Sequence, residues 1–300
     1  MIPPFSSPEK SLIRDSCLQQ VATLRTKVNR LLSYLGLPSP WMGDITIWRP
    51  HLGRILAVEM EERFIPDLVD RAYTLGLLHQ LTYYVGDIDQ ILQSGTDNYG
   101  CSMQSQFPLD LVNLDYCSGL VYEGFERISA LESLFRRQAS NLPAEGIKFP
   151  YFLLYITHSC HSSAGKQKIS KEYITYLTKD MNLYQGQIRQ NMEAVANWYS
   201  SDECPLEYRH KVFVFGKVLQ FAQDAGFLVS IKTAVAYKGD NETPMIHYQF
   251  EIHPHSIGSP IPADSRINVP IILDLPVVDI SGHDIAGDNR PKIGTFSGND

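Results

Sequence analysis

The stretch FLVSIKTAVAYKGDNETPMIHYQFEIH, residues 227–253, decides the fold of this chain. Apolar and polar side chains alternate over 227–237 and again over 245–253, which is the pattern of strands with one buried face. Between the two runs, residues 238–241 read KGDN, and glycine with short polar side chains favours a tight turn. The pattern therefore predicts two antiparallel strands joined as a β-hairpin.

Apolar runs alternate with helical patterns in the part of the chain that precedes this hairpin. Strands are expected at 54–59, 81–85, 109–114 and 151–157, and helices at 61–75, 124–140, 166–199 and 207–225. This alternation is typical of a parallel sheet covered by helices on both faces. The chain is therefore predicted to be an α/β protein with a Rossmann-like, doubly wound, mostly parallel sheet that ends in the antiparallel β-hairpin.

Two flanking segments complete the predicted organisation. Apolar residues recur at three- and four-residue steps over 11–34, which predicts an N-terminal helix. Residues 254–300 are rich in proline and lack a helical period, so we expect an extended C-terminal tail, laid over the domain at 271–273 and 277–278. The expected divisions are a helical arm over 1–34, a Rossmann-like domain over 35–253 and the tail over 254–300.

The composition and charge exclude several classes of protein. Hydrophobic residues at 44% and charged residues at 20% are ordinary for a globular chain, which excludes disorder throughout. The 26 Lys and Arg against 33 Asp and Glu disfavour a basic coat for nucleic acid, although residues 251–300 hold seven acids and three bases and so carry −4 of the net charge of −7. No apolar run approaches the roughly 18 residues of a membrane span. Five scattered cysteines disfavour disulfides and a zinc site, so a cytoplasmic protein without a metal is expected.

Polar residues at the ends of the expected strands are the first candidates for a site, because open parallel sheets bind ligands at the carboxyl ends of their strands. Glu59 ends the strand at 54–59, and Gly86 and Asp87 follow the strand at 81–85. Each carboxylate also has a structural interpretation, since acids stabilise the first turn of a helix and Asp is a good N-cap. Both interpretations stay open at this stage.

The segment DLVNLDYCSG, residues 110–119, brings polar and aromatic side chains to the same edge. Its apolar strand ends in Asn113, Asp115 and Tyr116, and burying such groups costs free energy unless they bind something. In the functional interpretation Asp115 orients a substrate or accepts a hydrogen bond from it, while Tyr116 stacks against it. In the structural alternative, Asp115 and Ser118 cap the following helix and the tyrosine packs.

The order of elements over about residues 35–253, with its last two strands antiparallel, resembles that of the class I S-adenosylmethionine-dependent methyltransferases. The segment 110–119 is similar to the D-x-D-P-[FY]-G motif of the tRNA guanine dimethyltransferases. Asn113 takes the place of the first acid and Asp115 that of the second, but the proline before the aromatic is missing. The resemblance implies that Asn113, Asp115 and Tyr116 form the catalytic part of the site, which holds the amine of a nucleobase.

The same resemblance assigns the cofactor side of the site. It implies that Glu59 binds the ribose hydroxyls of S-adenosylmethionine and that Asp87, beside Gly86, binds the adenine amino group. Methyltransferases of this class normally open with a strand and a glycine-rich turn, and no such motif stands in this sequence. The nearest substitute is 36–50, in which Gly43 and Asp44 would face the cofactor and Trp41 or Trp48 would line the pocket. The alternative for that stretch is a structural connector. The stretch lies in a segment of only about 20 residues, from 35 to 55, whereas a complete strand–helix–strand unit takes roughly 30 residues.

Two functions are therefore carried forward. The first is a methyltransferase that uses S-adenosylmethionine to modify an amino group of a nucleobase in tRNA, DNA or RNA. The second is a catalytically inactive, Rossmann-like subunit that binds or scaffolds a larger complex, with the helix at 11–34 and the tail as partner-contacting arms. The expected partners are accordingly a nucleic-acid substrate or a protein subunit, and no membrane.

Overall fold

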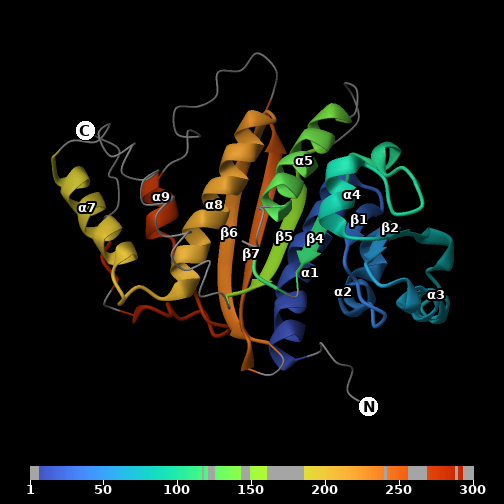
Figure 1. Ribbon diagram of the computed structural model, residues 1–300, viewed down its shortest axis with the longest axis horizontal. Helices are drawn as coiled ribbons and strands as arrows, with labels where there is room; N and C mark the ends of the chain where they lie inside the picture. Colours follow the sequence, from blue (N-terminus) through green and yellow to red (C-terminus); the bar gives the residue numbers. More distant parts are fainter. Residues whose placement is uncertain are drawn as a thin grey trace.

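A sheet of seven strands, in the order β3-β2-β1-β4-β5-β7-β6, forms the centre of the molecule (Figure 1). The computed structural model describes residues 7–116, 118–120, 126–142, 149–160, 186–239, 242–255, 269–287 and 290–292. The strands are β1 (Leu32–Gly36), β2 (Leu52–Glu59), β3 (Leu81–Val85), β4 (Leu111–Asp115), β5 (Phe152–Ser159), β6 (Phe227–Lys238) and β7 (Pro244–Pro254). Strands β1 to β5 pair in parallel, whereas β7 is antiparallel to both β5 and β6. This confirms the predicted mostly parallel sheet with its antiparallel hairpin.

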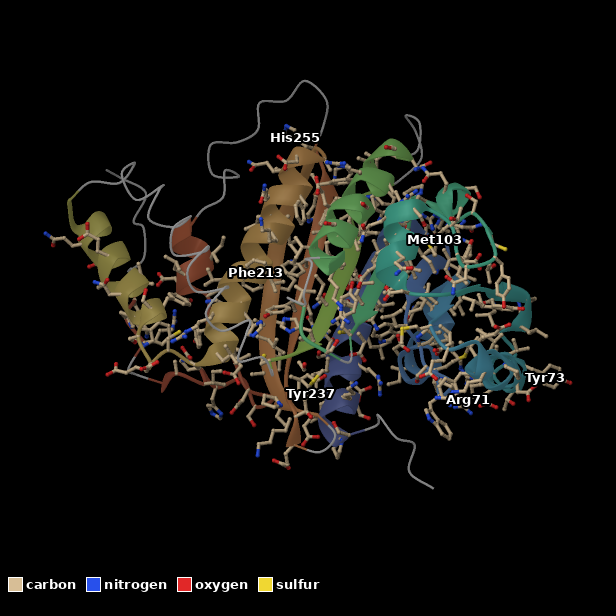
Figure 2. All side chains as sticks on the ribbon, in the orientation of Figure 1. Arg71, Tyr73, Met103, Phe213, Tyr237 and His255 are labelled. Carbon is tan, nitrogen blue, oxygen red and sulfur yellow. The ribbon has the colours of Figure 1, made fainter. Side chains whose placement is uncertain are left out.

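Helices cover both faces of this sheet, as the doubly wound pattern predicts (Figure 1). The α-helices are α1 (Pro8–Val28), α2 (Gly43–Trp48), α3 (Ile65–Thr74), α4 (Ile88–Ser94), α5 (Glu126–Ser140), α7 (Gly186–Ser200), α8 (Leu206–Asp224) and α9 (Val269–Asp274). Short 3-10 helices lie at Arg49–His51, Glu62–Phe64, Leu78–Gln80 and Gln104–Gln106. Of the helices that cover the sheet, α4, α5 and α8 share one apolar core with it, and α1, α2 and α3 share the other. Met103 and Phe213 are buried in the first core, whereas Tyr73 of α3 projects from the surface (Figure 2).

Alternation along the strands explains how one sheet serves two cores. In β1, Tyr34 belongs to the core under α1, and its neighbour Leu35 belongs to the core under α4 and α5. Successive side chains of a strand point to opposite faces, so both must be apolar when both faces are covered. All five residues of β1 are buried, which fits its place between β2 and β4 in the middle of the sheet.

The prediction of one helix over 11–34 is wrong in its second part. Helix α1 ends at Val28, because Asn29 adopts the left-handed conformation (φ 55°) that stops a helix. The apolar residues that follow form β1 from Leu32, since a short apolar run fits a buried strand as well as a helix. The first strand of the sheet, which the sequence analysis did not identify, is therefore β1. The expected boundary between 34 and 35 falls inside β1, and the division into three parts stays a prediction.

The first strand–helix–strand unit is short because its helix is short. The connection from β1 to β2 holds only α2, a helix of six residues, followed by one 3-10 turn. The stretch 36–50, singled out as the substitute for a glycine-rich turn, is this connection. The abbreviated unit therefore accounts for the small number of residues between the two strands.

The C-terminal tail packs on the domain where the apolar residues predict it. Ile272, Leu273 and Val277 are buried, and the backbone of Val278 bonds to β6 at Ala234 and Ala236. The tail also contains α9, a short helix that the proline-rich sequence did not predict. Residues 166–185 of the predicted helix 166–199 lie outside the described part of the chain, as do the turn residues 240–241. Within the described ranges, no helix is both long and apolar enough to cross a membrane.

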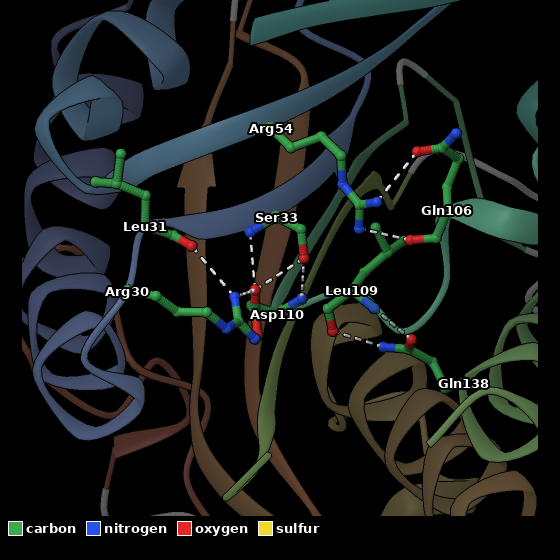
Figure 3. Close-up of polar contacts among 8 residues, drawn as sticks. All are labelled: Arg30, Leu31, Ser33, Arg54, Gln106, Leu109, Asp110 and Gln138. Carbon is green, nitrogen blue, oxygen red and sulfur yellow. Dashed lines mark hydrogen bonds and ion pairs between the residues drawn. The ribbon is translucent and has the colours of Figure 1, made fainter. Parts of the chain in front are cut away.

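A polar cluster fixes the amino-terminal ends of β1 and β4 (Figure 3). Asp110, which is fully buried, accepts hydrogen bonds from the Arg30 guanidinium at 2.6 and 2.7 Å. The same carboxylate accepts from the backbone N and the hydroxyl of Ser33, both at 2.8 Å. Next to it, the Gln138 side chain bonds to both backbone groups of Leu109. A carboxylate satisfied in this way holds neighbouring strands together, and it lies at the opposite end of β4 from Asp115.

Candidate functional site

A pocket of about 540 Å³ opens at the carboxyl ends of β1, β2, β3 and β4. Its walls come from the β1–α2 connection, the segments that follow β2 and β3, the segment after β4 and the start of α5. The volume falls within the roughly 300–1,000 Å³ that is usual for small-molecule sites. The pocket thus lies at the edge of the sheet where the sequence predicts a site.

Glu59 is the last residue of β2 and lines this pocket. Its Oε1 accepts a hydrogen bond from the backbone N of Glu61 at 2.9 Å, which fixes the direction of the carboxylate. Partial burial raises the pKa of Glu59 above its ordinary value. The next helical turn is the 3-10 helix Glu62–Phe64, and α3 begins at Ile65, so both the structural and the functional interpretation of Glu59 stay open.

Gly86 and Asp87 follow β3 and line the pocket as well. Gly86 has a φ of 140°, and a Cβ there would lie 2.7 Å from the Asn98 Oδ1, so this turn requires glycine. Asp87 is the N-cap of α4, and its Oδ1 accepts a hydrogen bond from the backbone N of Asp89 at 2.7 Å. The structural interpretation of Asp87 is therefore correct, and the residue stands at the pocket as well.

Asp44 and Asn113 come together, but behind the pocket rather than on its wall. Both are buried, and the Asn113 amide donates a hydrogen bond to the Asp44 Oδ2 at 2.9 Å. The hydroxyl of Tyr34 donates to the same carboxylate oxygen. Gly43 lies beside Arg14, since a Cβ on this glycine would come within 2.8 Å of the guanidinium carbon. Contact of Gly43, Asp44 or Asn113 with a ligand therefore stays a prediction.

Asp115 stands between two cavities. It lines the large pocket and also a neighbouring cavity of about 30 Å³, which has room for roughly one or two water molecules. Lys10, from the first turn of α1, lies 3.2 Å from the Asp115 Oδ2 and pairs with it. Asn113 and Trp48 line the small cavity, whereas Trp41, which is 42% exposed, lines the large one. Of the two tryptophans considered from the sequence, Trp41 is thus the one at the large pocket.

Tyr116 contacts two pocket residues that the sequence analysis did not single out, Asp89 and Arg127. The Tyr116 hydroxyl donates to the Asp89 Oδ1 at 2.8 Å, and the Arg127 Nε lies 3.3 Å from the Asp89 Oδ2. All three residues line the pocket. Burial raises the pKa of Asp89 to about 6, because the hydrogen bond from Tyr116 and the charge of Arg127 only partly oppose the loss of hydration. The one signal in the sequence was a second acid two residues after Asp87, which reads as an ordinary residue of a first helical turn.

No protein-family model and no curated protein sequence matches the chain. Among solved structures, the chain is similar to the N-methyltransferase NodS from Bradyrhizobium japonicum WM9 in complex with S-adenosyl-L-homocysteine (10% identity, 83% of this chain and 90% of that one, TM-score 0.42). It is similar to the O-methyltransferase TomG from Streptomyces achromogenes in complex with S-adenosylmethionine (12% identity, 82% and 81%, TM-score 0.40). It is also similar to the methyltransferase domain of bacterial CtHen1-C (10% identity, 82% and 100%, TM-score 0.42).

Similarities with TM-scores at this level carry no inference about ligand or reaction, so the fold is assigned from the strand pairing. Parallel strands β1 to β5, followed by an antiparallel hairpin of β6 and β7 that joins the sheet at β5, form the arrangement that the resemblance in the sequence implies. The pocket described above lies at the carboxyl ends of these parallel strands. The chain therefore has a Rossmann-like fold, with the strand arrangement that the resemblance in the sequence implies.

Proposed function

We propose that the chain is an S-adenosylmethionine-dependent methyltransferase whose cofactor binds in the pocket at the carboxyl ends of β1 to β4. One observation carries the proposal: Glu59 and Asp87 follow two neighbouring parallel strands and line one pocket. The resemblance assigns the ribose to the first acid and the adenine to the second. A nucleoside placed across the ends of β2 and β3 would reach both carboxylates.

The chemistry of the pocket fits such a cofactor. A carboxylate such as that of Glu59 offers several acceptor positions, which suits the two hydroxyls of a ribose. Acidic side chains outnumber basic ones on the pocket wall, where Glu59, Glu61, Asp67, Asp87, Asp89 and Asp115 stand against Arg127. A cationic ligand gains from such a surface. When bound, S-adenosylmethionine supplies an electrophilic methyl group on a positively charged sulfur.

The β1–α2 connection differs from the glycine-rich turn that usually meets the cofactor in methyltransferases of this class. Gly36 leaves room for Tyr34, whose hydroxyl would lie 2.0 Å from a Cβ at that position, so this glycine serves the protein rather than a ligand. Pro40 and Trp41 then line the pocket with Leu37, which gives it an apolar wall in place of bare backbone. This wall can pack against a purine or a methionine chain, although it offers few backbone donors.

We propose that the group that receives the methyl is an amino group, more specifically one on a nucleobase. It enters the pocket beside Asp115. Asp115 stands at the border of the two cavities, and a carboxylate there can hold an amine and accept its proton. Tyr116 adds an aromatic wall beside it. Positioning of this kind, with water excluded, is the main contribution that a protein makes to direct group transfer.

An inactive binding subunit is the alternative, and the replacement of the glycine-rich turn by Pro38 and Pro40 is the observation that favours it. The two functions differ in one measurable property. The methyltransferase must bind S-adenosylmethionine on its own, whereas a scaffold with this connection has no need to. Titration of the full chain with the cofactor therefore separates them.

The experiment is isothermal titration calorimetry of the wild-type chain, Glu59→Gln and Asp87→Asn with S-adenosylmethionine. We expect saturable binding by the wild type and an affinity at least tenfold lower in each variant, because each loses a charged acceptor. Asn is also a good N-cap, so α4 should keep its start in Asp87→Asn. Glu132→Gln and Asp224→Asn make the same chemical changes on α5 and at the end of α8, away from the pocket, and should bind as the wild type does. Wild-type protein that binds no cofactor would contradict the proposal.

A further inference from the structure

Asp89, Tyr116 and Arg127 form a closed cluster on one wall of the pocket. They come from α4, from the segment after β4 and from α5, and each touches the other two. The Asp89 carboxylate accepts from the Tyr116 hydroxyl and pairs with Arg127, and the Arg127 guanidinium carbon lies 4.4 Å from the centre of the Tyr116 ring. Asp89 is 4% exposed and Tyr116 is 3% exposed, so these two members are almost closed to water, while Arg127 is partly exposed.

Arg127 extends the cluster to the backbone of the pocket wall. Its Nη1 donates to the carbonyl oxygens of Ser118 at 3.0 Å and Gly119 at 2.6 Å. Ser118 and Asp115 are themselves pocket residues, on either side of Tyr116. The guanidinium therefore ties α4, α5 and the segment after β4 together, and a planar group with several donors is suited to such a task.

We propose that Asp89, Tyr116 and Arg127 act as a positioning clamp that holds the Asp115–Ser118 wall of the pocket in its ligand-binding shape. The inference rests on the proposed function and adds a role for pocket residues other than Glu59 and Asp87. Asp89 acts through its two partners: the ionised carboxylate aligns the Tyr116 ring and holds Arg127, which in turn holds the backbone. A wall that is already in place costs the ligand no ordering free energy on binding.

The placement of Asp89 favours this role over a purely structural one. A buried carboxylate that serves only stability should be fully hydrogen-bonded, because the loss of its hydration costs several kcal/mol. In the part of the chain that the structure describes, the groups that face Asp89 are Tyr116, Arg127 and the like-charged Asp87, and burial leaves the pKa of Asp89 raised. An acid held at such a cost beside a pocket is typical of a functional site.

The first test is binding of S-adenosylmethionine by Asp89→Asn, Tyr116→Phe and Arg127→Lys. Each is expected to bind about tenfold more weakly than the wild type, because each removes one or two bonds of the clamp. The matched controls are Asp224→Asn, Tyr73→Phe and Arg136→Lys, all on exposed residues, and their affinity should not change. The affinity of the wild type should also fall relative to that of Asp89→Asn as the pH is lowered from about 7 to 5, since protonation removes the charge that holds Arg127.

The second test needs no ligand. Hydrogen–deuterium exchange of the free protein should show faster exchange in peptides that cover 115–119 in Arg127→Lys than in Arg136→Lys, with the rest of the sheet unchanged. Faster exchange together with weaker binding supports the clamp. Unchanged exchange in that segment, or variants that bind within twofold of the wild type, would overturn it. Wild-type protein that binds no cofactor would instead overturn the proposed function, so the two failures are distinguishable.

Discussion

Two buried acids near opposite ends of strand β4, Asp110 just before the strand and Asp89 on α4, are in opposite situations. At the amino-terminal end, Asp110 is completely buried and accepts four hydrogen bonds, two of them from one guanidinium (Figure 3). Near the carboxyl end, Asp89 is almost as buried, but its side-chain partners among the described residues are one hydroxyl at 2.8 Å and one guanidinium nitrogen at 3.3 Å. Asp110 lines neither of the two cavities described above, whereas Asp89 lines the large one.

This difference separates an acid that joins two strands from an acid that, in the proposed clamp, holds the wall of a pocket. A carboxylate with all of its acceptor positions in use has nothing left to offer, and its contribution is to join strands. A buried carboxylate with fewer donors beside a pocket costs stability, and in the proposed clamp it holds the pocket wall in place. The comparison therefore predicts that substitutions at the amino-terminal edge act on stability, and those at the carboxyl edge act on binding.

The largest effect is expected for Asp110→Asn. The amide offers one acceptor oxygen and leaves the Arg30 guanidinium, which is half-exposed and can be hydrated, without its bidentate partner. We therefore expect the free energy of unfolding to fall by about 2–3 kcal/mol. Urea denaturation followed by circular dichroism measures this loss, with Asp224→Asn as the control for the same chemical change. A loss below about 1 kcal/mol would show that the hydrogen bonds of Asp110 do not hold β1 and β4 together.

A smaller and pH-dependent effect is expected for Asp89→Asn. The pKa of Asp89 is raised to about 6, so the folded chain binds this proton more tightly than the unfolded chain does. The contribution of Asp89 to stability is therefore fully present at low pH and declines as the pH rises through about 6. Relative to Asp89→Asn, the wild type should lose about 1 kcal/mol between about pH 5 and pH 8.

Denaturation of both proteins across that pH range measures the difference directly. Because all other titrating groups are common to the two proteins, the difference isolates Asp89. A difference that stays flat, or that changes in favour of the wild type as the pH rises, would show that the Asp89 carboxylate is as well satisfied as that of Asp110. The comparison between the two ends of β4 would then fail.

Much of the fold could be predicted from local patterns. The hairpin at 227–253 and the strands at 54–59 and 81–85 were readable, because apolar runs and turn residues report on neighbours in the chain. The start of β1 was not, since nothing in the apolar residues after Val28 distinguishes a helix from a buried strand. Only the left-handed Asn29 separates the two elements.

The site was partly predictable for a related reason. Glu59 and Asp87 were found because the ends of parallel strands meet at one edge, a rule that needs only strand order. Asp89 was missed because its partners, Tyr116 and Arg127, lie 27 and 38 residues away in the sequence. The resemblance alone placed Asp44 at the cofactor and Asn113 in the catalytic part of the site, and the structure shows that the two side chains bond to each other.

The most direct test of the central claim is hydrogen–deuterium exchange of the full chain with and without S-adenosylmethionine. If the cofactor binds across the carboxyl ends of the strands, protection should appear in peptides covering 37–41, 58–61 and 86–89. Peptides at the opposite edge, covering 30–33 and 109–111, should exchange as in the free protein. Protection at the first set alone is the predicted result. No change in that set at saturating cofactor, or protection confined to the opposite edge, would contradict the account.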